Sequence, residues 1–237
     1  MVGATDAPVL AVLTRAPSSG GKTRLFASLG APPDVGLLTA LLLDTLDGGT
    51  VPGVRRVVAV TPASACDEVR TIVGDAEVIS QPDGELGVRM RTTMAACFAG
   101  GAPAVVLVGS DLPHITPAVI AEACARVMRE PQTLVLGPAI DGGYYLIGAR
   151  RVPDTFSGIT WGSPDVLAQT QRAAVADGYR VYLLPTMTDV DNADALRDAA
   201  RSGQAPRTAA WLDARVKSSG QSPQVPGGCD GLPDSTT

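Results

Sequence analysis

Three aspartates follow apolar, strand-like runs, at positions where carboxylates can do chemistry. Asp111 comes directly after the apolar run 105–108 and the dipeptide Gly-Ser, and Asp189 and Asp191 follow a later strand-like run at alternate positions. Carboxylate oxygens are hard ligands that suit Mg²⁺ or Mn²⁺, and such an ion can bridge the phosphates of a nucleotide. The acids therefore predict a metal site. The alternative is that Asp111 caps a helix or turn, and that Asp189 and Asp191 cap the next helix and offset its dipole.

A glycine-rich loop with two cations follows the first strand-like run, 9–13. Gly20 and its neighbour allow backbone N–H groups to approach a phosphate, and Lys22 and Arg24 can neutralise it. The stretch 16–23 also fits a relaxed Walker A pattern. However, the segment Gly-Ala-Pro-Pro at 30–33 ends the following helix within about two turns, whereas a P-loop feeds a longer helix. We therefore predict a phosphate-contacting loop rather than a P-loop ATPase or GTPase.

Asp141 and the two glycines after it separate two further strand-like runs, 133–137 and 144–148. One interpretation is the tight turn of a hairpin. The other is catalytic: Asp141 would be the base that activates an acceptor, and the glycines would give a sugar or phosphate close access to the backbone.

Three further side chains have two interpretations each. His114 is the only histidine, which excludes a histidine-based triad or a multi-histidine metal site, and it is either a base or a turn residue. Trp161 either stacks on a ligand or packs beneath a loop. Arg89, in the first turns of a predicted helix at 88–98, either reaches a phosphate or is solvated.

The scaffold predicted for these residues is an α/β domain. Strand-like runs alternate with helical patterns, which is typical of a mostly parallel, doubly wound sheet between helical layers. In such sheets ligands bind outside the carboxyl ends of the strands. The runs on either side of Asp141 lack an intervening helix and predict an antiparallel insertion. We expect helices to begin after Asp34, at Pro117 and after Asn192.

The predicted domain spans residues 1–216 and ends in a short helix at 207–216. Residues 217–237 are rich in Ser, Gly, Pro and Gln without periodicity, so we predict a disordered C-terminal tail.

Composition excludes several classes of protein. A net charge of -5 argues against a nucleic-acid-binding surface, which is normally basic. The four cysteines have no paired spacing, so we expect buried thiols in a reducing compartment rather than disulfides or a zinc site. No signal peptide precedes the first strand, and no apolar run approaches the roughly 18 residues of a membrane span. We therefore expect a cytoplasmic protein that acts on small molecules.

Five motifs in order resemble a bacterial family with the GT-A nucleotide-diphospho-sugar transferase fold, whose members are usually labelled glycosyltransferases. They are Thr14-x-Ala-Pro-x-x-Gly-x-Lys-Thr-Arg-Leu25, Gly84-Glu-Leu-Gly-x-Arg-Met90, Gly109-Ser-Asp-x-Pro113, Leu136-Gly-Pro-x-x-Asp-Gly-Gly-Tyr-Tyr-Leu-Ile-Gly148 and Asp189-Val-Asp191. More distantly, the first, third and fifth resemble 2-phospho-L-lactate guanylyltransferases, in which the equivalents of the three aspartates hold Mg²⁺ beside the nucleotide phosphates. Gly21 departs from the family pattern, which more often has an apolar residue there.

The resemblance implies a Rossmann-like, three-layer GT-A fold and a metal-dependent transferase that uses a nucleotide-activated donor. We expect an NDP-sugar glycosyltransferase with an unidentified small-molecule acceptor. Nucleotidyl transfer to a small phosphorylated substrate and non-catalytic nucleotide binding are the alternatives. The predicted site comprises metal ligands Asp111, Asp189 and Asp191, catalytic residues Asp141 and Lys22, and nucleotide contacts Gly20, Lys22, Arg24, Gly87 and Arg89.

Overall fold

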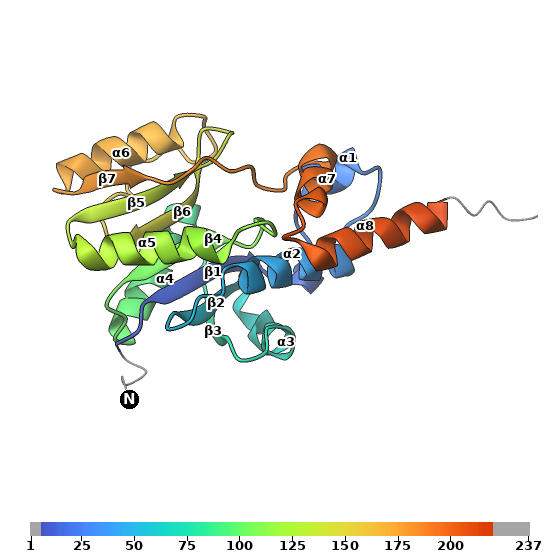
Figure 1. The fold of residues 1–237 in the computed structure, drawn as a ribbon, viewed down its shortest axis with the longest axis horizontal. Coiled ribbons are helices and arrows are strands. Elements are labelled where there is room, and N and C mark those ends of the chain that lie inside the picture. Colours follow the sequence, from blue (N-terminus) through green and yellow to red (C-terminus); the bar gives the residue numbers. More distant parts are fainter. Residues whose placement is uncertain (1–5, 220–237) are drawn as a thin grey trace, which may run out of the picture.

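The computed structural model describes residues 6–219, and most of the predicted tail lies outside them. The described chain forms a seven-stranded sheet with helices on both faces (Figure 1). Its strands are β1 (Val9–Arg15), β2 (Arg55–Thr61), β3 (Glu77–Ser80), β4 (Val105–Gly109), β5 (Thr133–Pro138), β6 (Tyr144–Ala149) and β7 (Arg180–Leu183). Its α-helices are α1 (Thr23–Ser28), α2 (Val35–Gly48), α3 (Cys66–Ile72), α4 (Leu86–Ala99), α5 (Pro117–Arg129), α6 (Val166–Ala176), α7 (Ala193–Arg201) and α8 (Pro206–Ser219).

The strand order β3-β2-β1-β4-β6-β5-β7 confirms a mostly parallel sheet with an antiparallel insertion. Only β6, among the described strands, runs opposite to its neighbours β4 and β5, and the remaining adjacent pairs are parallel. The carboxyl ends of the other strands therefore meet at one edge of the sheet. The loops that carry Lys22, Asp111 and Asp189 all leave from that edge.

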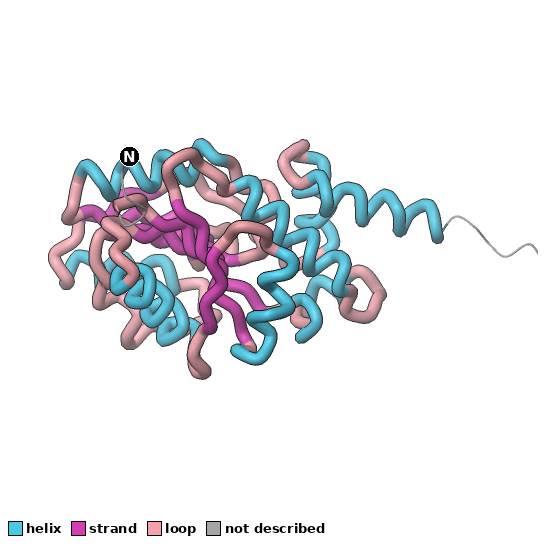
Figure 2. The backbone as a smooth tube through the Cα atoms, turned by 90° about the horizontal axis from the view of Figure 1, so that it is seen from below, coloured by secondary structure: helices cyan, strands magenta, loops and turns pink. Residues whose placement is uncertain are grey.

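The sheet lies between two helical layers, as expected for the three-layer fold (Figure 2). Because side chains alternate along a strand, β1 contributes to both cores. Leu10 and Val12 belong to the core that includes α2, α3 and α5, whereas Val9, Ala11 and Leu13 belong to the core that includes α4 and α6. Burial on both faces explains why this strand is continuously apolar in sequence.

The predicted helix starts are confirmed at their termini. The Asp34 carboxylate accepts a hydrogen bond from the amide of Leu37 (2.9 Å) at the start of α2. The Asn192 side chain accepts two from the first turn of α7. Helix α5 begins at Pro117.

A third apolar cluster joins α1, α2, α7 and α8. Helix α8 is anchored to α2 by the fully buried side chain of Asp44, which accepts hydrogen bonds from the amides of Arg207 (3.2 Å) and Thr208 (2.8 Å). Helix α8 continues to Ser219, three residues beyond the end at 216 that the sequence predicts.

Three of the cysteines, Cys66, Cys97 and Cys124, are buried free thiols, as expected; Cys229 lies outside the described residues. None of the helices between residues 6 and 219 has the length and apolarity needed to cross a bilayer.

Candidate active site at the carboxyl edge of the sheet

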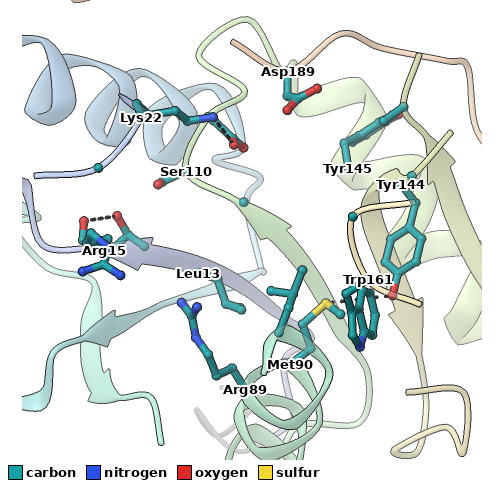
Figure 3. Close-up of a pocket in the computed structure, with 18 of the residues that line it drawn as sticks. Leu13, Arg15, Lys22, Arg89, Met90, Ser110, Tyr144, Tyr145, Trp161 and Asp189 are labelled. Atoms are coloured by element: carbon teal, nitrogen blue, oxygen red, sulfur yellow. Dashed lines mark hydrogen bonds and ion pairs between the residues drawn. The ribbon is translucent and has the colours of Figure 1, made fainter. Parts of the chain in front are cut away.

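A cavity of about 450 Å³ opens at the carboxyl edge of the sheet, above the ends of β1 and β4 (Figure 3). Its walls differ in chemistry. Lys22, Ser110 and Asp189 form a polar side, and Met90, Tyr144 and Trp161 form an apolar, aromatic side. Such a mixture of one broad apolar wall and a few charged groups is typical of a small-molecule site.

The three predicted metal ligands come together beside this cavity. Asp111, Asp189 and Asp191 each offer a carboxylate oxygen, and these oxygens lie within 4.8 Å of one another. The loop after β4, which carries Asp111, and the loop after β7, which carries Asp189 and Asp191, are joined by a hydrogen bond. It runs from the amide of Val190 to the carbonyl of Asp111 (2.9 Å). Val190 is itself fully buried in the cluster around α1 and α7. The alternate spacing therefore has a physical cause: the middle residue anchors the loop, and the two acids flanking it meet Asp111.

None of the three aspartates is the N-cap of a helix. Helix α5 begins six residues after Asp111, with Thr116 at its N-cap position. Helix α7 is capped by Asn192 rather than by Asp189 or Asp191.

Lys22 lies between two of these carboxylates. Its ammonium is 2.6 Å from Asp111 Oδ2 and 2.5 Å from Asp191 Oδ1, and the side chain is only 20% exposed. The loop reaches this position through left-handed backbone: Gly20 has φ 66°, Gly21 φ 124° and Lys22 φ 50°. Gly21, the departure from the family pattern, therefore adopts a conformation that glycine reaches at little cost.

The electrostatics of the cluster favour a cation. The pKa of Asp189 is raised to about 6, chiefly by burial and also by the neighbouring charges of Asp111 and Asp191, which Lys22 offsets only in part. Burial lowers the pKa of Lys22, but its two carboxylate partners outweigh burial and the net shift is upward. Three converging oxygen donors with a cation already between two of them fit the ligand preference of Mg²⁺ or Mn²⁺.

The other predicted site residues divide into two groups. Gly20, Arg89 and Asp141 line the cavity with Lys22, Asp111 and Asp189. Asp141 is also a turn residue, because its Oδ1 accepts a hydrogen bond from the amide of Gly143 (2.9 Å).

Arg24 and Gly87 are not part of the cavity lining. The Arg24 side chain is 87% exposed and lies 3.8 Å from Asp191. Gly87 is buried, and a Cβ added there would lie 2.8 Å from both the Phe156 carbonyl and the Trp161 ring. The glycine therefore allows Trp161 to pack on helix α4, and Trp161 both packs there and lines the cavity.

The lining also includes polar and aromatic side chains that the sequence did not place in the site, among them Arg15, Tyr144 and Tyr145. Arg15 lies at the end of β1, and Tyr144 and Tyr145 begin β6. Arg15 carries a sequence signal of its own, because a charged residue directly after a buried strand lies at the ligand-binding edge of the sheet. His114 is not among the lining residues; burial lowers its pKa, and its Nδ1 has no hydrogen-bond partner among the described residues.

Comparison with known proteins supports the architecture. The profile of a family described as "Uncharacterized protein conserved in bacteria (DUF2064)" matches residues 45–163. A structure from Desulfovibrio desulfuricans G20, proposed to be a nucleotide-diphospho-sugar transferase, superposes with a TM-score of 0.78 at 27% identity, covering 88% of this chain and 95% of that one. A search of curated proteins gave no significant match.

More distant structures share the fold. A nucleotidyl transferase from Methanothermobacter thermautotrophicus has a TM-score of 0.57 at 17% identity, covering 84% of this chain and 98% of its own. CMP:2-keto-3-deoxy-manno-octonic acid synthetase, solved with CTP, has a TM-score of 0.55 at 15% identity, covering 84% and 99%. These neighbours confirm the GT-A-like fold, and they are transferases of two types, acting on nucleotide-sugars or on nucleotides.

Proposed function

The chain belongs to the bacterial family described as DUF2064, and we propose that it is a metal-dependent transferase whose donor is an NDP-sugar. The observation that carries the proposal is the convergence of Asp111, Asp189 and Asp191 beside a cavity with an aromatic wall. The 27% identity with the Desulfovibrio structure supports the same class of donor.

Mg²⁺ or Mn²⁺ would be held by the three aspartates, where it would supply Lewis acidity to the departing nucleotide diphosphate. Lys22, which now lies between Asp111 and Asp191, would be free to neutralise phosphate charge from the β1 loop. The exposed guanidinium of Arg24, in the first turn of α1, would add a donor for phosphate oxygens. Gly20, with its left-handed backbone, would let the β1 loop approach the phosphates closely.

Asp141 is the acceptor-side base in this proposal. It lines the cavity, and its Oδ1 is oriented by the amide of Gly143. The carboxylate takes the proton of an acceptor hydroxyl while the acceptor oxygen bonds to the sugar's anomeric carbon and the bond to the nucleotide diphosphate breaks. Trp161 and Tyr144, which meet edge to face with ring centroids 6.4 Å apart, provide an apolar surface for the sugar ring.

A second function, nucleotidyl transfer from an NTP to a small phosphorylated substrate, is favoured by the charge of the β1 loop. Arg15, Lys22 and Arg24 place three cations within ten residues, which suits a triphosphate. The two reactions release different products: glycosyl transfer releases a nucleoside diphosphate, and nucleotidyl transfer releases pyrophosphate.

The test is a screen of NDP-sugars and of the four NTPs with Mg²⁺ or Mn²⁺, with nucleoside diphosphate and pyrophosphate measured separately. We expect nucleoside diphosphate release from one NDP-sugar, lost in Asp111→Ala and kept in Asp194→Ala, a matched change of an exposed acid on α7. Pyrophosphate release alone would establish the second function. Release that Asp111→Ala leaves unchanged would refute both.

A further inference from the structure

Two arginines line the cavity without an acidic partner. Arg15 lies at the end of β1 and Arg89 in the second turn of α4, and Figure 3 shows both on the side of the cavity away from Asp189, near Leu13. Within residues 6–219, neither guanidinium has a carboxylate oxygen within the 4.0 Å of an ion pair. The cation on the other side, Lys22, has two. The described part of the chain therefore gives neither arginine a direct carboxylate partner.

Arg89 is held in place by a buried glutamine. Gln81 directly follows β3 and is 4% exposed. The Gln81 side chain donates from Nε2 to the carbonyl of Thr14 (2.9 Å) and accepts at Oε1 from Arg89 Nε (2.6 Å). Its backbone N–H donates to the carbonyl of Val60 (2.8 Å). Gln81 thus connects the ends of β1, β2 and β3, and it engages only the ε nitrogen of Arg89. The two terminal nitrogens of that guanidinium remain available to a ligand.

Arg15 is placed by the β1 loop. A Cβ at Gly21 would lie 3.3 Å from Arg15 Cδ, so the aliphatic part of Arg15 runs along the glycine backbone. Burial lowers the pKa of Arg89, and the charge of Arg15 lowers it further, which agrees with two like charges facing each other. An anion between them would replace repulsion by charge-assisted hydrogen bonds, and the planar guanidinium suits phosphate and carboxylate groups.

We propose that Arg15 and Arg89 form a subsite for an anionic group of the substrate, a phosphate or carboxylate, separate from the phosphates beside the aspartate cluster. The proposal rests on the function proposed above, since it names a feature of that reaction's substrate. The anionic group belongs either to the acceptor or to the distal end of a nucleoside triphosphate. Gln81 acts as a positioning residue for this subsite.

The test is calorimetric titration of inorganic phosphate into the full-length chain, in EDTA and at constant ionic strength. Without a divalent ion, Lys22 stays paired with its carboxylates. We expect Arg15→Gln and Arg89→Gln each to weaken phosphate binding about tenfold or more. Arg91→Gln, a matched change of an exposed arginine on the same helix, should leave it unchanged. Unchanged binding in both cavity variants, or equal weakening in Arg91→Gln, would overturn the proposal.

A second titration identifies the source of the anion. The protein is saturated with Mg²⁺ and whichever of ATP, GTP, CTP and UTP binds best, and inorganic phosphate is added. Continued arginine-dependent phosphate binding assigns the subsite to the acceptor. Loss of phosphate binding, together with weaker triphosphate but unchanged diphosphate affinity in Arg15→Gln, assigns it to the nucleotide.

A different variant tests the proposed function independently of the arginine subsite. Asp111→Asn should abolish metal-dependent nucleotide binding and leave phosphate binding in EDTA intact.

Discussion

Replacing Lys22 by methionine should have opposite effects on the metal and on the nucleotide. The ammonium lies 2.6 Å from Asp111 Oδ2 and 2.5 Å from Asp191 Oδ1, where a divalent ion would bind, so the ion must displace it. Methionine keeps much of the side chain's length and apolar stem but removes the charge. Metal affinity without nucleotide should therefore rise. Nucleotide affinity in saturating metal should fall, because the phosphates lose a cation.

The magnitude follows from the partial exposure of these groups. The side chains of Lys22, Asp111 and Asp191 are 20%, 28% and 36% exposed, so water recovers part of each charge when the pairs separate. Partly exposed ion pairs contribute about 0.2–1 kcal/mol each. Displacing two such contacts costs the metal about 0.5–2 kcal/mol, so Lys22→Met should tighten the metal Kd by roughly 2- to 30-fold.

Free Mn²⁺, measured by electron paramagnetic resonance during titration, reports the metal affinity directly. Lys217→Met, at the only other lysine of the chain and exposed on α8, is the matched control and should leave the metal Kd unchanged. Weaker Mn²⁺ binding in Lys22→Met, or equal effects of the two substitutions, would refute the displacement of Lys22 by the metal.

Three further predictions concern the scaffold. Asp44→Asn should lower the free energy of unfolding in urea by about 2–3 kcal/mol, because it weakens the fully buried cap of α8. Asp47→Asn, at an exposed acid of the same helix, should lower it by less than about 1 kcal/mol. Equal losses of stability would contradict the anchoring role of Asp44. Gly87→Ala should destabilise the protein by about 1–3 kcal/mol and shift tryptophan fluorescence, while Gly100→Ala, at the other end of α4 with 3.4 Å of clearance, should leave the fluorescence unchanged. Burial depresses the pKa of His114, so its contribution to stability is present above pH 6.5 and is lost as the pH falls through that value. Between pH 7 and 5.5, the free energy of unfolding in urea should therefore fall less in His114→Gln than in the wild type. Identical falls in the two proteins would contradict this role of His114. The raised pKa of Asp189 acts in the opposite direction in both proteins, so their difference isolates the histidine.

The sequence was informative wherever a local rule decides the structure. Continuous apolar runs predicted β1 and β4, because strands buried on both faces have no polar side. Capping chemistry predicted the starts of α2 and α7 at Asp34 and Asn192. The aspartates could be placed at one edge of the sheet because the carboxyl ends of parallel strands meet there.

The features of the site that could not be predicted from the sequence depend on contacts between distant segments of the chain. Lys22 meets Asp111 across 89 positions and Asp191 across 169. The packing role of Gly87 arises from Trp161, on a loop far along the chain. The orientation of Arg89 is set by the side chain of Gln81, a residue that also connects the ends of β1, β2 and β3. Neither periodicity nor residue type encodes these pairings.

The measurement that tests the central claim most directly is nucleotide binding with and without Mg²⁺ in the wild type and in Asp111→Asn. Nucleoside diphosphate titrated by calorimetry should bind the wild type at least about tenfold more tightly with Mg²⁺ than in EDTA, since the ion joins carboxylates to phosphates. Asp111→Asn should remove that difference, and Asp194→Asn should retain it. Nucleotide affinity that does not depend on Mg²⁺, or a Mg²⁺ effect that survives in Asp111→Asn, would contradict a metal-dependent site at the aspartate cluster.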